Sequence, residues 1–200
     1  MWVAFLFSDP CWQLAAGEAV QAGFFKTTGG PQMIKVGDAL PAVKLMEYVE
    51  VEGNGCSIGP NPVELPQALA GKTIALFAVP GAFTPTCSVS HLPGYIQQAD
   101  AFKAAGVDEI WCVAVNDAFV MGAWGREQKA AGKVRMIADG DAALAKALGL
   151  TLDLNGKGLG LRSNRYSMLI KDGKVATLNV EGPGKFEVSD AATLLAQATA

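Results

Sequence analysis

Short apolar runs alternate with stretches of helical periodicity along most of the chain. The apolar runs have the length and the β-branched and aromatic content of buried strands, and they cover residues 72–79, 110–115, 134–138, 165–170 and 174–180. The helical stretches, which begin at polar caps or end at glycines, cover 84–92, 95–105, 118–130, 141–148 and 190–198. Asp172-Gly173, between the last two apolar runs, is a strong signal for a two-residue hairpin turn. The alternation predicts one α/β domain built around a mixed sheet.

The composition favours a packed globular domain. Half of the residues are hydrophobic and the net charge is −3, which is unlike a disordered chain. The basic residues are scattered, and no run of them forms the electrostatic footprint of a nucleic-acid-binding protein. No apolar stretch reaches the roughly 20 residues that cross a bilayer. We therefore expect neither a nucleic-acid partner nor a membrane partner.

The first 32 residues differ in character from the rest. Met1–Phe7 is apolar, but no basic region precedes it and the run is short for a secretory signal. Lys26 is the only basic residue of the segment, whereas mitochondrial transit peptides are rich in arginine. We expect residues 1–32 to be a disordered N-terminal extension and residues 33–200 to form the domain. Since no sorting signal is recognised, the expected location is the cytoplasm.

The four cysteines lie far apart, at positions 11, 56, 87 and 112, and the chain has a single histidine, His91. No two cysteines form a Cys-x-x-Cys pair, which excludes the usual zinc spacings and a thioredoxin-type dithiol motif. We expect no bound metal and no cofactor. Sparse cysteines suit a reducing compartment, where an isolated thiol is more often catalytic or redox-sensing than structural. We assign no role to Cys11 or Cys56.

The residues around Cys87 place its thiol in the first turn of a helix. Pro80-Gly81 ends the preceding strand, Thr84 is a good N-cap, and Pro85 suits the first helical position because its missing N–H is not needed there. Cys87 then falls at the third helical position. The amides and the dipole of a helix N-terminus favour negative charge, so the sequence predicts a largely ionised, nucleophilic thiol. The alternative is a buried, inert cysteine.

This stretch resembles a family signature. Pro80, Thr84 and Cys87 match the Pro-x-x-x-Thr-x-x-Cys motif of the peroxiredoxins, and segment 79–94 is similar to the type II group of plants and bacteria, which is related to mammalian peroxiredoxin five. Further segments agree in order and spacing, namely 115–121, 138–140, 147–150, 158–160 and 165–168. The resemblance runs from about Met33 to the C-terminus. It implies a thioredoxin-like fold and a reaction in which the Cys87 thiolate attacks the O–O bond of hydrogen peroxide or an organic hydroperoxide and becomes a sulfenic acid.

The same resemblance implies roles for three other residues. The hydroxyl of Thr84 would contact the thiolate and the peroxide oxygens, although a cap alone would also explain a threonine here. Pro80 would shield the site from water, but a proline that only ends a strand is equally consistent with the sequence. Arg165 matches the active-site arginine of the family, whose permanent charge would stabilise the thiolate. Arg162 is the alternative arginine, and we favour Arg165.

The regeneration step has two interpretations. Members of the mammalian type carry a second cysteine in the loop after the hairpin, but residues 180–189 contain none. Cys112 matches the second cysteine of plant and bacterial type II members, yet its apolar context is also that of a core thiol. We favour a cycle in which glutathione captures the Cys87 sulfenic acid and glutathione or glutaredoxin then reduces it, with resolution by Cys112 as the alternative. Thioredoxin is another candidate reductant, and the family implies a homodimer.

Two further signals carry less weight. His91 follows Cys87 by about one helical turn and could act as its base, but a solvated or core-edge histidine is favoured because the family places no catalytic base there. The glycine-rich segment 155–160 lacks the Gly-Lys-Ser/Thr ending of a phosphate-binding loop. A thiol peroxidase is the leading function. A redox-sensing or chaperone-like binding protein is the second, and a cysteine hydrolase is disfavoured because no residue can be named that would orient His91.

Overall fold

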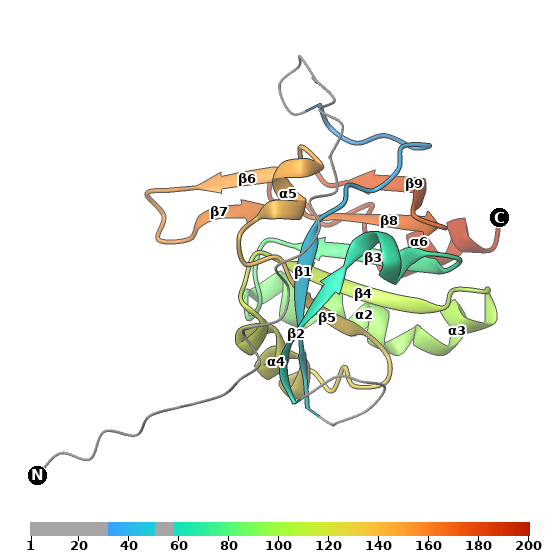
Figure 1. The fold of residues 1–200 in the computed structure, drawn as a ribbon, viewed down its shortest axis with the longest axis horizontal. Helices are drawn as coiled ribbons and strands as arrows, with labels where there is room; N and C mark the ends of the chain where they lie inside the picture. The colour runs from blue at the N-terminus through green and yellow to red at the C-terminus, as the bar shows by residue number, and fades with distance from the viewer. Residues whose placement is uncertain (1–31, 51–57) are drawn as a thin grey trace, which may run out of the picture. The chain divides into compact units, whose positions relative to one another are not determined.

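The computed structural model describes residues 32–50 and 58–200 (Figure 1). The extension expected over residues 1–32 therefore lies, apart from Gln32, outside the described residues, and so do Cys11 and Cys56. Within the described ranges no helix has the length and apolar character needed to cross a membrane.

A seven-stranded mixed sheet forms the centre of the fold, with its strands in the order β2-β1-β5-β4-β3-β8-β9. The strands are β1 (Lys44–Val49), β2 (Gly59–Glu64), β3 (Thr73–Val79), β4 (Glu109–Ala114), β5 (Arg135–Ala138), β8 (Tyr166–Lys171) and β9 (Lys174–Val180). β4 pairs in parallel with β3 and β5, and the other neighbours are antiparallel. All five predicted strands belong to this sheet. The predicted α/β, thioredoxin-like fold with a mixed central sheet is confirmed.

Helices cover both faces of the sheet (Figure 1). One face packs against α2 (Leu92–Gln97), α3 (Ala99–Ala104), α4 (Ala118–Glu127) and α6 (Ala191–Ala198), and the other against α1 (Leu65–Leu69) and α5 (Ala143–Ala147). Side chains of β3 alternate between these two cores, so that Phe77 lies in the first and Leu76 in the second. A strand buried on both faces is apolar throughout, which explains why β3 is such a clear signal in the sequence.

The Asp172-Gly173 turn joins β8 to β9 as predicted. Its two residues have φ angles of 47° and 73°, and the flanking Lys171 and Lys174 are paired across the hairpin. Both central residues therefore occupy the left-handed region that a type I′ turn requires. The hairpin prediction is confirmed.

Other elements give no clear signal in the sequence. β2 contains two prolines and a glycine, which a strand tolerates at a sheet edge, and β2 lies at the edge. Its neighbour β1 is only partly buried, so its apolar pattern is weak. A separate hairpin consists of β6 (Thr151–Leu154) and β7 (Gly160–Ser163). The glycine-rich segment connects these two strands, whereas a phosphate-binding loop connects a strand to a helix.

The helix that follows β3 begins where the sequence predicts but continues differently. Cys87–His91 forms a π-helical turn, and α2 and α3 come after it. Pro93 follows this wider turn and sits near the start of α2, where its missing amide is not needed. A second break at Gln98 separates α2 from α3. The single helix predicted over 95–105 is therefore corrected to two short helices.

Candidate active site

Cys87 lies at the junction between β3 and the π-helical turn. The chain leaves β3, turns through residues 80–84 and enters the helix, so the thiol has the local position that the sequence predicts. Within the turn, Phe83 adopts a left-handed φ of 62°, and the amide of Ala82 donates to Oδ1 of Asn116 at 3.0 Å. Cys87 itself is fully buried. A π-helical turn at a buried thiol is notable because such turns are frequent at functional sites.

Thr84 forms a different hydrogen bond from the one expected. Its hydroxyl donates to the carbonyl oxygen of Gly81 at 2.9 Å, and its own carbonyl accepts from the amide of Ser88 at 3.0 Å. No amide in the described part of the chain donates to this hydroxyl, so the predicted side-chain cap is not formed. The tight turn brings the Gly81 carbonyl within reach of the Thr84 hydroxyl, and this carbonyl accepts the hydroxyl's hydrogen bond.

Arg162 binds the backbone of this turn and not the cysteine. Its Nε donates to the carbonyl of Leu159 at 2.7 Å. Its Nη1 lies 3.5 Å from the carbonyl oxygen of Pro80 and 3.4 Å from Oδ1 of Asn116. Pro80 follows β3 directly and is half-buried. Arg162 therefore supports the shape of the turn that contains Pro80.

Arg165, just before β8, is the arginine that reaches the sulfur. Its Nη2 lies 3.5 Å from Sγ of Cys87, and its Nη1 lies 2.9 Å from Nδ1 of His91. The guanidinium carbon is 5.6 Å from the centre of the Phe186 ring, which is a cation–π distance. None of the ion pairs among the described residues includes Arg165. Its positive charge therefore faces the sulfur without a paired carboxylate.

His91 is a buried, neutral partner of Arg165. Its ring is fully buried, and Nε2 lies 3.0 Å from the carbonyl oxygen of Ser189. Burial, followed by the adjacent charge of Arg165, lowers the pKa of His91 to about 3. The expectation of a solvated or core-edge histidine is wrong. A role as base for Cys87 is also excluded in this arrangement, because both ring nitrogens already have partners.

Cys112 lies in β4 opposite Phe77 of β3, in the same apolar core as Cys87. It is fully buried, and both of these cysteines are reduced. Burial, and then the nearby Cys87, raise the pKa of the Cys112 thiol well above its usual range, while Arg165 has the opposite effect. Cys112 is therefore a neutral core thiol in this conformation.

The arrangement around Cys87 suits a nucleophilic thiol. Cys87 lies at a helix start and the guanidinium of Arg165 reaches its sulfur, and both features would stabilise negative charge that develops there during a reaction. A cysteine hydrolase needs a base with an orienting partner at the sulfur, and no such pair reaches Cys87 among the described residues. The described ranges also contain no cluster of three or more side chains placed to ligate a metal.

Similar proteins point to one family. The family model described as Redoxin matches residues 35–195. Peroxiredoxin-2B of Arabidopsis thaliana is 52% identical over 126 residues, which cover 63% of this chain and 78% of the plant protein. The crystal structure of reduced Prx3 from Vibrio vulnificus, in complex with hydrogen peroxide, is 52% identical with a TM-score of 0.77 and covers 83% of this chain and 99% of the Vibrio chain.

A third similar protein comes from Burkholderia cenocepacia and is described provisionally as a thioredoxin reductase. It is 59% identical, with a TM-score of 0.81, and the match covers 82% of this chain and 98% of the Burkholderia chain. The present sequence has no Cys-x-x-Cys pair, which is the usual thioredoxin-type redox motif. The buried Cys87 thiol beside the guanidinium of Arg165 agrees instead with the Redoxin match.

Proposed function

Because the chain belongs to the peroxiredoxins, in the type II or peroxiredoxin-five-like group, we propose that Cys87 is the nucleophile of a thiol peroxidase. Glutathione, with or without glutaredoxin, reduces the oxidised form of this enzyme. Membership of the family by itself makes the protein a peroxidase of the peroxiredoxin type. The choice of residues and of reductant is our proposal. The observation that carries it is the 3.5 Å contact between Nη2 of Arg165 and Sγ of Cys87.

In the first step, the Cys87 thiolate attacks one oxygen of the peroxide. The S–O bond forms at the proton-bearing oxygen as the O–O bond breaks, and the leaving oxygen takes a proton from solvent water to become water or an alcohol. Arg165 stabilises the thiolate before the step and the departing oxyanion during it. Cys87 is left as a sulfenic acid. The sulfur has been oxidised by two electrons and the peroxide has been reduced by two.

Two residues of the turn before Cys87 assist this step. The Thr84 hydroxyl, which donates to the Gly81 carbonyl, can exchange that bond for one to a peroxide oxygen. Its lone pairs can accept a hydrogen bond from the hydroperoxide proton. Pro80 has no amide proton and places an apolar ring at the end of β3, which limits access of water to the sulfur.

In the second stage, a glutathione thiolate attacks the sulfenic sulfur, and the sulfenic oxygen leaves as hydroxide, which takes a proton from solvent to become water; a mixed disulfide remains on Cys87. The thiolate of a second glutathione, or of glutaredoxin, then attacks the glutathione sulfur of that disulfide, so that the Cys87 thiolate leaves and glutathione disulfide, or a mixed disulfide of glutathione with glutaredoxin, forms. Cys112 is disfavoured as the internal thiol because it is neutral and packed in the core, and a neutral thiol is a poor nucleophile. Access of glutathione to the buried Cys87 requires the π-helical turn to open locally.

We also propose that the enzyme is a homodimer of the cytoplasm. Phe83, Val89 and Val188 have large apolar side chains that are 48%, 76% and 41% exposed, and they belong to the segments that surround Cys87. Exposed apolar groups beside a functional site favour a protein interface. The reducing cytoplasm supplies glutathione. Sedimentation at micromolar concentration tests the dimer, and a monomer there would contradict it.

The central experiment measures consumption of hydrogen peroxide and of an organic hydroperoxide with three reductants supplied separately. We expect multiple turnovers with glutathione and faster turnover with glutathione plus glutaredoxin, and a lower rate with thioredoxin. Cys87→Ser should abolish turnover with every reductant. A single stoichiometric oxidation of the wild-type protein, with no turnover under any condition, would favour a redox sensor and contradict the proposal.

The role of Cys112 is decided by one variant. Cys112→Ser should keep turnover with glutathione, because the proposed cycle does not use this thiol. If the variant consumes one equivalent of peroxide and then stops, Cys112 is the resolving residue and the one-cysteine cycle is wrong.

A further inference from the structure

We propose that His91 is a positioning residue, which holds the guanidinium of Arg165 against Sγ of Cys87 at the end of a hydrogen-bond chain that starts from the Glu181 carboxylate. The inference rests on the proposed function, in which Cys87 is the nucleophile. His91 does not touch the substrate in this scheme. It acts through Arg165.

The first link of the chain determines the tautomer of His91. A guanidinium can only donate hydrogen bonds, so Nδ1 of His91 accepts from Nη1 of Arg165 across their 2.9 Å contact. The ring proton is therefore on Nε2, and Nε2–H donates to the carbonyl oxygen of Ser189 at 3.0 Å. Both ring nitrogens therefore form a hydrogen bond, and the partner of each one determines whether that nitrogen donates or accepts.

The second link fixes the carbonyl of Ser189. This oxygen also accepts from the hydroxyl of Tyr95 at 2.9 Å. The amide and the hydroxyl of Ser189 both donate to Oε1 of Glu181, at 2.8 and 2.9 Å. The amides of Glu187 and Val188 donate to the same oxygen, each at 2.8 Å. One buried carboxylate oxygen thus orders the segment that presents the Ser189 carbonyl to His91.

Aromatic rings fix the plane of the imidazole. The centroid of the His91 ring lies 4.8 Å from that of Phe77 and 4.8 Å from that of Phe186, and 5.7 Å from that of Tyr95. Phe186 also contacts the guanidinium of Arg165. The ring therefore has neither the space nor the hydrogen-bond partners to rotate, and the direction of its Nδ1 lone pair is set.

A neutral acceptor is what this position requires. A carboxylate in the same place would orient the guanidinium but would also pair with its charge and weaken its field at the sulfur. Among the charged groups near His91, Arg165 lowers its pKa, whereas Glu181 and Asp190 raise it, and burial has the largest effect. The resulting pKa of about 3 keeps His91 neutral at physiological pH. Arg165 is held in place and keeps its full charge.

The first test uses the unaltered protein, because His91 is the only histidine of the chain. A proton–nitrogen correlation spectrum of the imidazole, recorded on protein without a histidine tag, distinguishes the two neutral tautomers from the imidazolium. We expect the Nε2–H tautomer between about pH 5 and pH 8, and a shift of the Nδ1 resonance in Arg165→Lys. An Nδ1–H tautomer, or an imidazolium at pH 7, would overturn the inference.

The second test measures the rate at which iodoacetamide alkylates Cys87 as a function of pH, read on the Cys87 peptide by mass spectrometry. His91→Leu removes the acceptor, so the profile should move to higher pH and the rate at pH 7 should fall about tenfold or more. His91→Asn should keep most of the rate, because Oδ1 is bonded to Cγ as Nδ1 is and can accept from Arg165. Circular dichroism checks that each variant is folded.

Trp111→Phe is the matched control. Trp111 is also fully buried and donates a hydrogen bond to Glu109, but it lies in the opposite core from Cys87, so its alkylation profile should stay close to that of wild type. A folded His91→Leu with the wild-type profile would overturn the inference, as would equal losses in His91→Leu and Trp111→Phe. If His91→Leu does not fold, the tautomer of His91 in the wild-type protein decides whether the inference holds.

Alkylation needs no peroxide, so the two proposals can fail separately. A wild-type protein without peroxide turnover, combined with a shifted profile in His91→Leu, would contradict the proposed function and leave the positioning role intact. A wild-type protein that turns over peroxide, combined with an unshifted profile in His91→Leu, would contradict the positioning role alone.

Discussion

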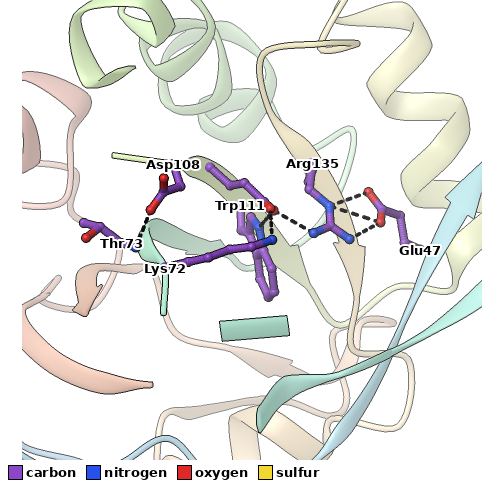
Figure 2. A network of polar contacts seen from close by, with 7 residues as sticks. Glu47, Lys72, Thr73, Asp108, Trp111 and Arg135 are labelled. Atoms are coloured by element: carbon purple, nitrogen blue, oxygen red, sulfur yellow. Dashed lines mark hydrogen bonds and ion pairs between the residues drawn. The ribbon is translucent and has the colours of Figure 1, made fainter. Parts of the chain in front are cut away.

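Arg135 and Arg165 are two partly buried arginines that the fold uses in opposite ways. Figure 2 shows Arg135 facing Glu47, with Lys72 and Trp111 nearby. Nε of Arg135 donates to both oxygens of Glu47, at 3.1 and 3.2 Å, and Nη1 donates to Glu109 at 2.6 Å. Arg165 has no carboxylate partner among the described residues. Its contacts are a neutral imidazole, an aromatic ring and a sulfur.

The two arginines differ in whether their hydrogen-bond partners neutralise the charge of the guanidinium. Glu109 accepts from Lys72 and Trp111 as well as from Arg135, so the charges around Arg135 balance and the contacts stabilise the fold. The partners of Arg165 orient the guanidinium but do not neutralise it, which leaves its field for the thiol. In the proposed mechanism Arg165 acts on the thiol because its partners are neutral, whereas carboxylates balance the charge of Arg135.

The sharpest test compares the two conservative arginine variants. Arg165→Lys keeps the charge but loses the planar fork that contacts both His91 and Cys87, so kcat/KM for peroxide should fall about a hundredfold. Arg135→Lys is the control and should leave kcat/KM unchanged while lowering the free energy of unfolding. Steady-state kinetics and urea denaturation measure both effects. Loss of activity in Arg135→Lys alone would reverse the assignment.

A second variant makes Arg165 resemble Arg135. His91→Asp places a carboxylate beside the guanidinium, and the pairing of charges should lower the alkylation rate of Cys87 at pH 7 about tenfold relative to His91→Asn. The two variants have nearly the same size, so the comparison isolates the charge. Equal rates would show that a neutral partner is not required.

Removing the Glu109 carboxylate from the ion-pair network around Arg135 should lower the stability of the fold. Glu109→Gln leaves Lys72 and Arg135 with one partner fewer, and because these groups are partly exposed the free energy of unfolding should fall by only about 1–2 kcal/mol. Urea denaturation measures the change, and peroxide turnover should be unaffected. A lower turnover in this variant would indicate that the network around Arg135 is coupled to the surroundings of Arg165 and Cys87.

Acidification should distinguish His91, beside Arg165, from Glu109, beside Arg135, because their contributions to stability are lost at different pH values. The pKa of His91 is lowered to about 3, so the unfolded chain takes up its proton first and stability declines as pH falls below about 6.5. Although partial burial raises the pKa of Glu109, hydrogen bonds from Lys72, Arg135 and Trp111 lower it to about 2, so its contribution is lost only below about 4.5.

The window between pH 6.5 and pH 5 therefore reports on His91. We expect a decline of about 2 kcal/mol there in the wild-type protein, and a smaller decline in His91→Asn, because the asparagine side chain does not titrate. Urea denaturation at a series of pH values measures it. Identical pH dependence in the two proteins would contradict the buried, neutral state of His91.

Local patterns in the sequence predicted the position of Cys87 well. The breaker Pro80-Gly81 and the helix start at Pro85 act on their immediate neighbours, so they hold whatever the rest of the chain does. The hydroxyl of Thr84 was mispredicted because a cap depends on the exact path of the turn, which brings the Gly81 carbonyl closer than the expected amide.

Residues far apart in sequence were predicted poorly or only by resemblance. Arg165 is 78 positions from Cys87, and only the likeness to a family distinguished it from Arg162. His91 was misjudged because its spacing from Cys87 gives a helix face but not what packs on that face. Its partners Arg165 and Ser189 are 74 and 98 positions away.

The sequence by itself determined five strands of the central sheet (β3, β4, β5, β8 and β9), the hairpin at Asp172-Gly173 and the place of Cys87 at a helix start, because periodicity, caps and breakers act over a few residues. Only the tertiary structure decided which charges meet, since sheet register and helix packing bring distant segments together. The neutral link from Ser189 through His91 to Arg165 belongs to this second kind. It exists because burial removes water from the ring and leaves each nitrogen a single partner.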